Sequence, residues 1–340
     1  MTQLEWSSLP FGYQKTDYNL RSYYREGEWG KLEITHSEYI PVHIAATGLH
    51  YGQEAFEGLK AYMGKDGKIR LFRWEENARR MQDSANGVLM AVPPTELFKE
   101  AVYMAVRLNK QYVPPYGTGA SLYIRPLLFG SGPRVGVKPA DEYLFLVFVS
   151  PVGPYFKEGF NPVSIMVARD YDRAAPKGTG RYKVGGNYAA SLTAGEIAHR
   201  EGYASALFLD AREKKYIDEA GPANFFAIKG NTYITPLSDS ILPSITNRSL
   251  MDLARDMGMT VERRKVALEE LSEFDEVGAC GTAAVISPIR RIVDVEMGME
   301  WNYCLDGKAG EKSAALYKRL LDIQFGDAED KFGWTSLVDL

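Results

Sequence analysis

The 340-residue chain contains little cysteine and little histidine. Its two cysteines, Cys280 and Cys304, and its four histidines are scattered along the sequence. A disulfide framework needs several paired cysteines, and a zinc site needs cysteine or histidine ligands at short spacing. The sequence therefore argues against a disulfide-stapled domain and against a metal site. It favours a reducing compartment, and we expect the cytoplasm.

Long hydrophobic and long basic runs are absent as well. The best apolar run, residues 143–149, is far too short to cross a bilayer, and the N-terminus lacks the basic flank and apolar stretch of a signal peptide. The longest basic run is residues 263–265, and the net charge is −4. We therefore expect neither a membrane nor nucleic acid as a partner. Walker, dinucleotide, kinase and Gly-x-Ser-x-Gly loops are also missing.

What is present is an ordinary globular composition, 45% hydrophobic and 25% charged, in a chain long enough for two domains. The segment 153–162 is rich in glycine, proline and aromatic residues and is interpreted as a linker, which gives domains 1–152 and 163–340. Strands are adjacent more often than they alternate with helices, which predicts an α+β fold. Expected helices cover 75–90, 95–110, 187–201, 246–257 and 312–323; expected strands cover 32–34, 39–44, 59–63, 69–72, 121–129, 143–149, 163–167, 204–209, 215–219, 224–228, 232–235 and 276–279.

The stretch from Arg181 to Tyr188 carries the first chemical signal. Lys183 stands beside Gly185 and Gly186, which would let the backbone approach a bulky ligand and turn into the next helix. A partly desolvated lysine amine condenses readily with an aldehyde, so Lys183 is a candidate Schiff-base residue. A solvated surface lysine is the alternative, and the other signals must decide between them.

Four further features fit one cofactor, pyridoxal phosphate, which needs an amine, an acid partner for its ring nitrogen and a phosphate cradle. Glu219 could be the acid partner, or only a turn glutamate. The segment 242–246 opens a helix and could bind an anion, or simply cap the helix. The turn 280–284 offers a second anion site, and Arg79 or Arg80 could supply a cation.

Taken together, these motifs resemble the branched-chain amino-acid aminotransferases of the fold type IV pyridoxal-phosphate family. The resemblance runs from about residue 5 to residue 330. It implies two domains, a smaller N-terminal α/β domain and a larger C-terminal pseudo-barrel domain, and a homodimer. Its most specific pieces are Phe56-Glu57-Gly58, Tyr123-Ile124-Arg125-Pro126, Lys183-Val184-Gly185-Gly186-Asn187-Tyr188, Glu219-Ala220-Gly221-Pro222-Ala223-Asn224 and Gly281-Thr282-Ala283-Ala284.

The resemblance also implies roles for individual residues. Lys183 matches the Schiff-base lysine, Glu219 the partner of the pyridine nitrogen, and Tyr188 the partner of the phenolic oxygen. The matched phosphate ligands are Arg80, Ile245, Thr246 and Thr282. The matched substrate and interface positions are Tyr51, Phe56, Gly58, Tyr123, Arg125, Val137, Tyr155, Thr282 and Ala283.

The activity implied is a two-step, ping-pong transfer of the amino group between leucine, isoleucine or valine and 2-oxoglutarate. A D-amino-acid aminotransferase or an aminodeoxychorismate lyase would share Lys183 and Glu219, and a non-catalytic phosphate-binding protein is the remote alternative. Some family members carry a Cys-x-x-Cys redox pair, but Ala284 and Ser287 stand at those positions here. We therefore expect no thiol regulation of that kind.

Overall fold

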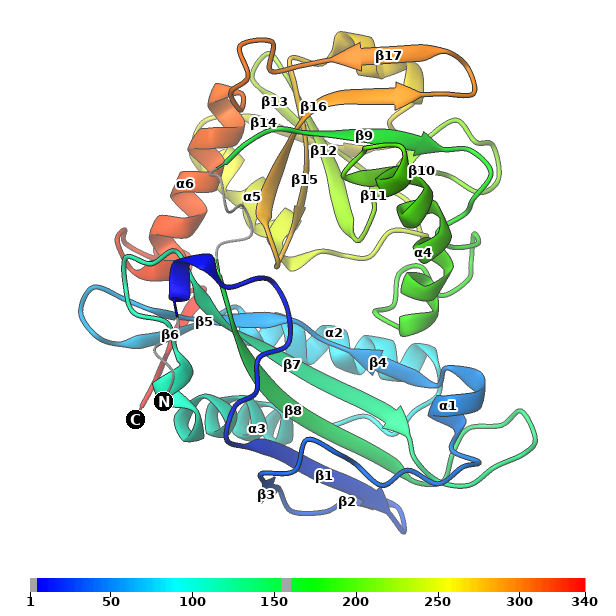
Figure 1. Ribbon diagram of the computed structural model, residues 1–340, viewed down its shortest axis with the longest axis vertical. Coiled ribbons are helices and arrows are strands. Elements are labelled where there is room, and N and C mark those ends of the chain that lie inside the picture. Colours follow the sequence, from blue (N-terminus) through cyan, green and yellow to red (C-terminus); the bar gives the residue numbers. More distant parts are fainter. Residues whose placement is uncertain (1–4, 154–159, 340) are drawn as a thin grey trace. The chain divides into compact units, whose positions relative to one another are not determined.

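The computed structural model describes residues 5–153 and 160–339, drawn as a ribbon in Figure 1. The chain forms two compact units. Unit 1 comprises Met1–Lys157, Tyr182–Gly185 and Asp322–Leu340, and unit 2 comprises Glu158–Arg181 and Gly186–Leu321. The linker expected at 153–162 includes residues 154–159, which lie outside the described part, so the domain boundaries stay a prediction. Within the described ranges, no helix has the length and apolar character needed to span a membrane.

Unit 1 is built on one mixed-length antiparallel sheet. Its strands follow the order β18-β6-β5-β7-β8-β1-β2, with β3 beside β1 and β4 beside β7. The strands predicted at 59–63 and 69–72 are confirmed and form a hairpin: Gly67 of the Asp-Gly turn takes a positive φ of 72°, and β5 returns as β6. The bounds are β1 Asn19–Arg25, β2 Glu28–Trp29, β3 Glu33–Thr35, β4 Glu54–Phe56, β5 Leu59–Met63, β6 Ile69–Phe72, β7 Ser121–Gly130, β8 Tyr143–Val152 and β18 Thr335–Val338.

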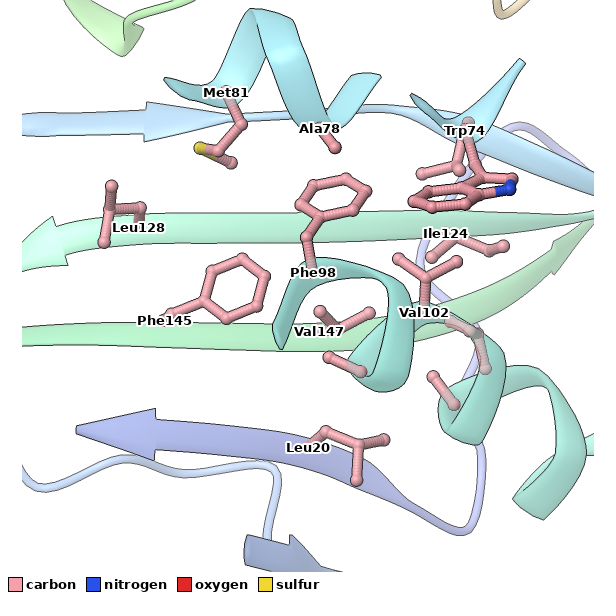
Figure 2. Close-up of a cluster of buried hydrophobic side chains, with 14 of the residues drawn as sticks. Leu20, Trp74, Ala78, Met81, Phe98, Val102, Ile124, Leu128, Phe145 and Val147 are labelled. Atoms are coloured by element: carbon pink, nitrogen blue, oxygen red, sulfur yellow. The ribbon is translucent and has the colours of Figure 1, made fainter. Parts of the chain in front are cut away.

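Two helices cover one face of this sheet, α2 (Trp74–Gly87) and α3 (Thr95–Leu108). Figure 2 shows side chains of both helices meeting those of the strands, and the rings of Phe98 and Phe145 stack with their centroids 6.0 Å apart. Leu122 and Ile124 are fully buried in the same cluster. Because strand residues alternate between faces, Tyr123 and Arg125 lie on the face without these helices, as predicted. The other helical segments of unit 1 are α1 (Thr47–Tyr51), η1 (Trp6–Ser8) and η2 (Lys110–Tyr112).

Unit 2 contains a sheet that closes on itself. Its order is β11-β10-β9-β16-β15-β12-β13-β14, with β17 beside β16, and β12 also pairs with β11. The strands β11, β10, β9, β16, β15 and β12 therefore form a ring, which confirms the pseudo-barrel. The bounds are β9 Val163–Ala168, β10 Ser205–Leu209, β11 Ile217–Ala220, β12 Ala223–Lys229, β13 Thr232–Pro236, β14 Thr260–Arg264, β15 Glu276–Gly281, β16 Val285–Asp294, β17 Met299–Asn302, α4 Gly185–Arg200, α5 Ile245–Asp256, η3 Leu268–Glu273 and α6 Glu311–Phe325.

The strand expected at 39–44 is wrong. This segment is irregular, Pro41 interrupts it, and the side chains of Tyr39 and Ile44 are 85% and 84% exposed. The apolar and aromatic residues suggested a strand, but the side chains of Tyr39 and Ile44 bury little surface in the chain itself. Sequence reasoning also missed α1, β1, β2, β4, β14, β16, β17 and β18.

Candidate active site

Lys183 is fixed through the backbone of its own segment. Its N–H donates to Ser84 Oγ on α2 at 2.9 Å, and its C=O accepts from the N–H of Phe56 on β4 at 3.1 Å. Val184 is buried in the core cluster of unit 1, and Tyr182 packs against the same cluster. The Lys183 side chain is thus held between two anchored neighbours.

Gly185 allows a close approach at the start of α4. Its N–H donates to a carboxylate oxygen of Glu54, and a Cβ built on Gly185 would collide with that oxygen. A larger residue here would displace the Glu54 carboxylate, so the contact adds a steric preference for glycine to the turn expected from the sequence. Gly186, by contrast, faces open space.

The amine of Lys183 lies in an environment that favours its neutral form. Its Nζ is 4.5 Å from the centroid of the Phe56 ring. The pKa of Lys183 is lowered to about 8, first by desolvation and then by the positive charge of Arg80, while Glu57 acts in the opposite direction. A neutral amine carries the lone pair that attacks an aldehyde or accepts a proton, so Lys183 has the properties of a reactive residue.

This pKa predicts the pH dependence of aldehyde capture by the protein without cofactor. The rate of reaction at Lys183 should rise up to about pH 8 and then level off, because the protonated amine has no lone pair. Borohydride trapping of pyridoxal phosphate at a series of pH values, with quantification of the Lys183 peptide, measures this profile. A yield at the Lys183 peptide that keeps rising well above pH 8 would contradict the prediction.

Arg80 is paired with a buried glutamate. Glu57 is fully buried, and its two carboxylate oxygens accept from Arg80 Nε at 2.7 Å and Nη2 at 2.8 Å. Asn77 Nδ2 donates to the same carboxylate at 2.7 Å. This two-point pairing fixes the plane of the guanidinium. Sequence reasoning assigned Arg80 a role but gave none to Glu57, although Glu57 stands inside a quoted motif.

The face of the sheet without α2 and α3 carries a row of polar groups. Arg125 Nη2 donates to the Tyr123 hydroxyl at 2.9 Å, and its guanidinium carbon is 4.8 Å from the Phe56 ring centroid. Lys60 pairs with Tyr123 in the β5–β7 register, and desolvation lowers the pKa of Lys60 to about 8. A Cβ on Gly58 would collide with the Tyr123 hydroxyl. Lys60 was missed by sequence reasoning, although alternation with buried Leu59 and Ala61 could have indicated its face.

Two of the predicted substrate and interface positions lie at the surface of unit 1, and a third is outside the described residues. Tyr51 and Val137 have exposed side chains, 42% and 83% respectively. The Tyr51 hydroxyl donates to the C=O of Val135, so the two segments are close. Tyr155 lies outside the described residues. The structure thus brings Lys183, Phe56, Gly58, Arg80, Tyr123 and Arg125 together in unit 1, with Tyr51 and Val137 at its surface.

In unit 2, Glu219 is a buried carboxylate with several donors. It is 2% exposed on β11. One oxygen accepts from Asn224 Nδ2 and from the N–H of Leu242, each at 2.9 Å, and the other is 3.0 Å from Arg173 Nε. Hydrogen bonds and a cation both favour the ionised form of a carboxylate. Sequence reasoning proposed Glu219 but missed Arg173.

The predicted phosphate cradle is the N-terminus of α5. Ser244 caps the helix by accepting the N–H of Asn247. The N–H groups of Ile245 and Thr246 belong to the first turn, where a helix supplies no internal acceptor and its dipole favours an anion. The side chains of Ile245 and Thr246 are buried, so the position is shaped by packing.

The two other predicted positions of unit 2 lie at a turn and on a helix. Thr282 and Ala283 belong to the short turn between β15 and β16, where Gly281 pairs with Val285. Val285 takes a positive φ of 66°, which is uncommon for a β-branched residue and marks the turn as constrained. Tyr188 lies in the first turn of α4 and is half-buried.

Unit 1 thus carries a lysine of lowered pKa and a fixed arginine, and unit 2 carries a buried carboxylate and a capped helix N-terminus. Residues 54–292 match the family model of the class IV amino-transferases, and the chain belongs to this family. A branched-chain-amino-acid aminotransferase of Haemophilus influenzae is 46% identical over the whole of both chains. One of Helicobacter pylori is 44% identical over 98% of each.

Solved structures are similar over almost the whole chain. The crystal structure of the Escherichia coli branched-chain amino acid aminotransferase has a TM-score of 0.81 and 31% identity, and covers 96% of this chain and 100% of its own. The branched-chain amino acid aminotransferase of T.th. complexed with N-(5'-phosphopyridoxyl)-L-glutamate has a TM-score of 0.77 and 26% identity, and covers 96% of this chain and 99% of its own. The fold class predicted from the sequence is therefore confirmed.

Proposed function

We propose that the protein is a pyridoxal-phosphate-dependent aminotransferase. It would move the amino group between L-leucine, L-isoleucine or L-valine and 2-oxoglutarate. Full-length similarity to enzymes named for branched-chain amino acids supports this substrate class. The single observation that carries the chemistry is the Lys183 amine, held by backbone hydrogen bonds beside Phe56 with its pKa lowered to about 8.

The residues present fit this cofactor. When bound, pyridoxal phosphate supplies an aldehyde for an amine and a ring that accepts an electron pair from the substrate. Lys183 would hold the aldehyde carbon, and Glu219 would keep the ring nitrogen protonated. Tyr188 would bind the phenolic oxygen. The phosphate would be held by Arg80, Thr246, Thr282 and the N–H of Ile245. The chemical type of each residue supports these assignments. The buried Glu219 carboxylate suits a protonated ring nitrogen, and the Arg80 guanidinium and the N-terminus of α5 suit a phosphate dianion.

The protein groups around Lys183 explain how a proton can be moved. In its neutral form, which the lowered pKa of about 8 makes accessible, the Lys183 amine would accept the proton from the substrate α-carbon. In its charged form, beside Glu57 and Arg80, the same amine would return that proton. The backbone of Lys183 is hydrogen-bonded to Ser84 and Phe56. The amine can therefore move only as far as rotation of its own side chain allows. The N–H groups of Thr282 and Ala283 would orient the α-carboxylate.

One pocket must accept an aliphatic side chain and the side-chain carboxylate of glutamate. Phe56 offers an apolar wall, with Gly58, Tyr51, Val137 and Tyr155 as the other predicted positions. Arg125 and Tyr123 would bind the carboxylate, and the adjacent Lys60 adds a second cation on the same face of the sheet. Polar groups gathered at one edge of an apolar surface allow both substrates without rearrangement.

Replacing Arg125 with alanine should separate the two substrates. We expect kcat/KM for glutamate to fall about 10- to 150-fold, the range for loss of a hydrogen bond to a charged group. The value for leucine should fall much less, because its side chain makes no use of the guanidinium. Lys60→Met should show the same selectivity with a smaller loss. Equal losses on both substrates would refute the assignment of Arg125 to the carboxylate.

A second copy of the chain is the proposed partner. The side chains of Ile44, Leu49, Val135 and Val137 are 66% to 86% exposed. The bridge between Ala46 and Pro133 brings their two segments together. Gathered apolar side chains on a surface mark an interaction site. We propose a homodimer that covers them, which sedimentation equilibrium of the purified protein tests.

We also propose that the protein works in the cytoplasm. Its two cysteines are free thiols in the structure, with Cys280 buried, as suits a reducing compartment. Fractionation of cells that express the untagged protein tests this proposal, and recovery with a secreted or periplasmic marker would contradict it.

A substrate panel tests the proposed function. The purified protein with added pyridoxal phosphate should turn yellow and transfer the amino group of L-leucine, L-isoleucine and L-valine to 2-oxoglutarate. D-alanine should be a poor donor. Turnover of D-alanine above L-leucine would favour a D-amino-acid aminotransferase. Release of pyruvate from aminodeoxychorismate would favour the lyase. A colourless protein that borohydride leaves unlabelled would favour a non-catalytic binding protein.

A further inference from the structure

We infer that Arg173 is a positioning residue that keeps the Glu219 carboxylate ionised and correctly oriented for the ring nitrogen of the cofactor. The inference rests on the proposed function, because it concerns how tightly and in which protonation state the cofactor ring is held. It adds a residue that no sequence motif indicated.

The Arg173 guanidinium is buried and has three different partners within unit 2. Its Nε lies 3.0 Å from a Glu219 oxygen, and the two side chains are 6% and 3% exposed. Its Nη2 donates to the C=O of Gly180 at 3.2 Å and to the C=O of Ser240. A charged group with so little water around it is held by its protein partners alone.

The partners of Arg173 and of Glu219 are linked along the chain. Ser240 closely precedes Leu242, whose N–H donates to the other Glu219 oxygen at 2.9 Å. Gly180 and Ser240 approach so closely that a Cβ on Gly180 would collide with the Ser240 carbonyl. The same loop continues to Ser244, the cap of α5. Arg173 thus fixes one oxygen directly and also fixes the loop that holds the other oxygen.

Amide groups complete the support of the carboxylate. Asn224 donates to Glu219 at 2.9 Å, and its own oxygen accepts from Asn247 Nδ2 at 3.1 Å. Asn247 also accepts from the Tyr233 hydroxyl at 2.8 Å. These neighbours are neutral, so they orient the carboxylate without supplying charge. Among these named partners, Arg173 alone carries the positive charge that stabilises a buried anion.

The charge determines where the proton lies. A proton shared by Glu219 and a ring nitrogen can sit on either group. Arg173 Nε lies 3.0 Å from the carboxylate, so its charge directly stabilises the ionised form of Glu219. Without Arg173, a buried Glu219 would take up the proton itself and the ring would lose its positive charge.

The experiment uses the full-length protein and compares Arg173→Met with Arg173→Lys. Two quantities are measured: the Kd of the cofactor-free protein for pyridoxal phosphate, and the pH midpoint of the absorption change of the bound cofactor. Arg173→Met should weaken binding about 10- to 100-fold, the scale for groups that orient a ligand-binding residue. It should also raise the pH midpoint by about one unit or more, because the ring loses its positive charge. Arg173→Lys keeps the positive charge, so its pH midpoint should lie close to the wild-type value. It should still lack part of the hydrogen bonding to the carbonyls of Gly180 and Ser240.

Arg169→Met is the matched control. Arg169 pairs with buried Asp294 at 2.6 Å in the same unit, so its loss removes a comparable ion pair away from Glu219. It should change thermal stability but leave the pH midpoint at its wild-type value. If Arg173→Met does not fold, Arg173→Gln takes its place, because it keeps a polar side chain without the charge and should raise the midpoint in the same way.

The outcomes separate this inference from the function on which it rests. An unchanged midpoint in Arg173→Lys and Arg173→Met, with normal cofactor binding by the wild type, overturns the role of Arg173. If Arg169→Met shifts the pH midpoint as much as Arg173→Met, the shift reflects a general loss of stability, and the role of Arg173 is overturned too. A wild-type protein that does not bind pyridoxal phosphate at all overturns the proposed function instead.

Discussion

Alanine at position 183 should abolish transamination, with a loss of at least about four orders of magnitude, because covalent attachment and proton transfer are removed together. Borohydride should no longer fix pyridoxal phosphate to this segment, while the cofactor's phosphate contacts remain. The backbone bonds of residue 183 to Ser84 and Phe56 use main-chain atoms of Lys183, so the variant should fold normally. Turnover with leucine and 2-oxoglutarate, and mass analysis of the reduced peptide, provide the measurements.

Two controls sharpen this result. Lys65→Ala, at an exposed lysine in the β5–β6 turn, should leave both readouts unchanged. A small primary amine added to Lys183→Ala should restore part of the rate, because it supplies the missing base without the tether. Wild-type turnover in Lys183→Ala would show that Lys183 is not the Schiff-base residue. Borohydride labelling of a different lysine in the wild-type protein would show the same.

The second large effect is expected at Glu57. Glu57→Gln should lower the free energy of unfolding by about 3–5 kcal/mol, since it leaves the buried Arg80 charge without its counterion. It should also weaken cofactor binding, because the plane of the guanidinium is no longer fixed. Denaturant unfolding of the cofactor-free protein measures the first effect, and titration with pyridoxal phosphate measures the second.

A double variant distinguishes the two roles of this pair. Glu57→Leu/Arg80→Met should recover much of the stability lost in the single variant, as apolar pairs often replace buried ion pairs. Cofactor affinity should stay low, because the arginine is gone. As a control, Glu196→Gln breaks an exposed ion pair with Arg200 and should change little. Full stability in Glu57→Gln would show that Arg80 does not depend on this carboxylate.

The sequence indicated the reactive residues of the site better than the residues that hold them in place. Lys183, Glu219 and Arg80 carry reactive or charged groups in motifs, so residue type and spacing pointed to them. Glu57 and Arg173 act by holding such residues. Their partners, Arg80 and Glu219, are distant in sequence and come near only in the fold. A counterion of this kind leaves no periodic or local signal, which is why sequence reasoning did not find it.

The fold shows the same limit. The β5–β6 hairpin and α3 followed local rules, a turn dipeptide in one case and helical spacing in the other. Strand β16 contains Pro288, and β17 and β18 are short, so each is defined by its neighbours more than by its own residues. The segment 39–44 has strand-like residues but has no strand partner in the described chain. Pairing, which decides such cases, cannot be read from one stretch of sequence.

The position of β18 has a consequence for biosynthesis. This C-terminal strand pairs with β6 at the border of the unit 1 sheet, from Thr335–Phe72 to Val338–Ile69. A nascent polypeptide therefore exposes the unpaired N–H and C=O groups of β6 while nearly all the remaining chain is still being translated. Such a border invites pairing with other chains. The edge of β6 therefore stays unpaired until Thr335–Val338 have been synthesised, long after β8 is complete.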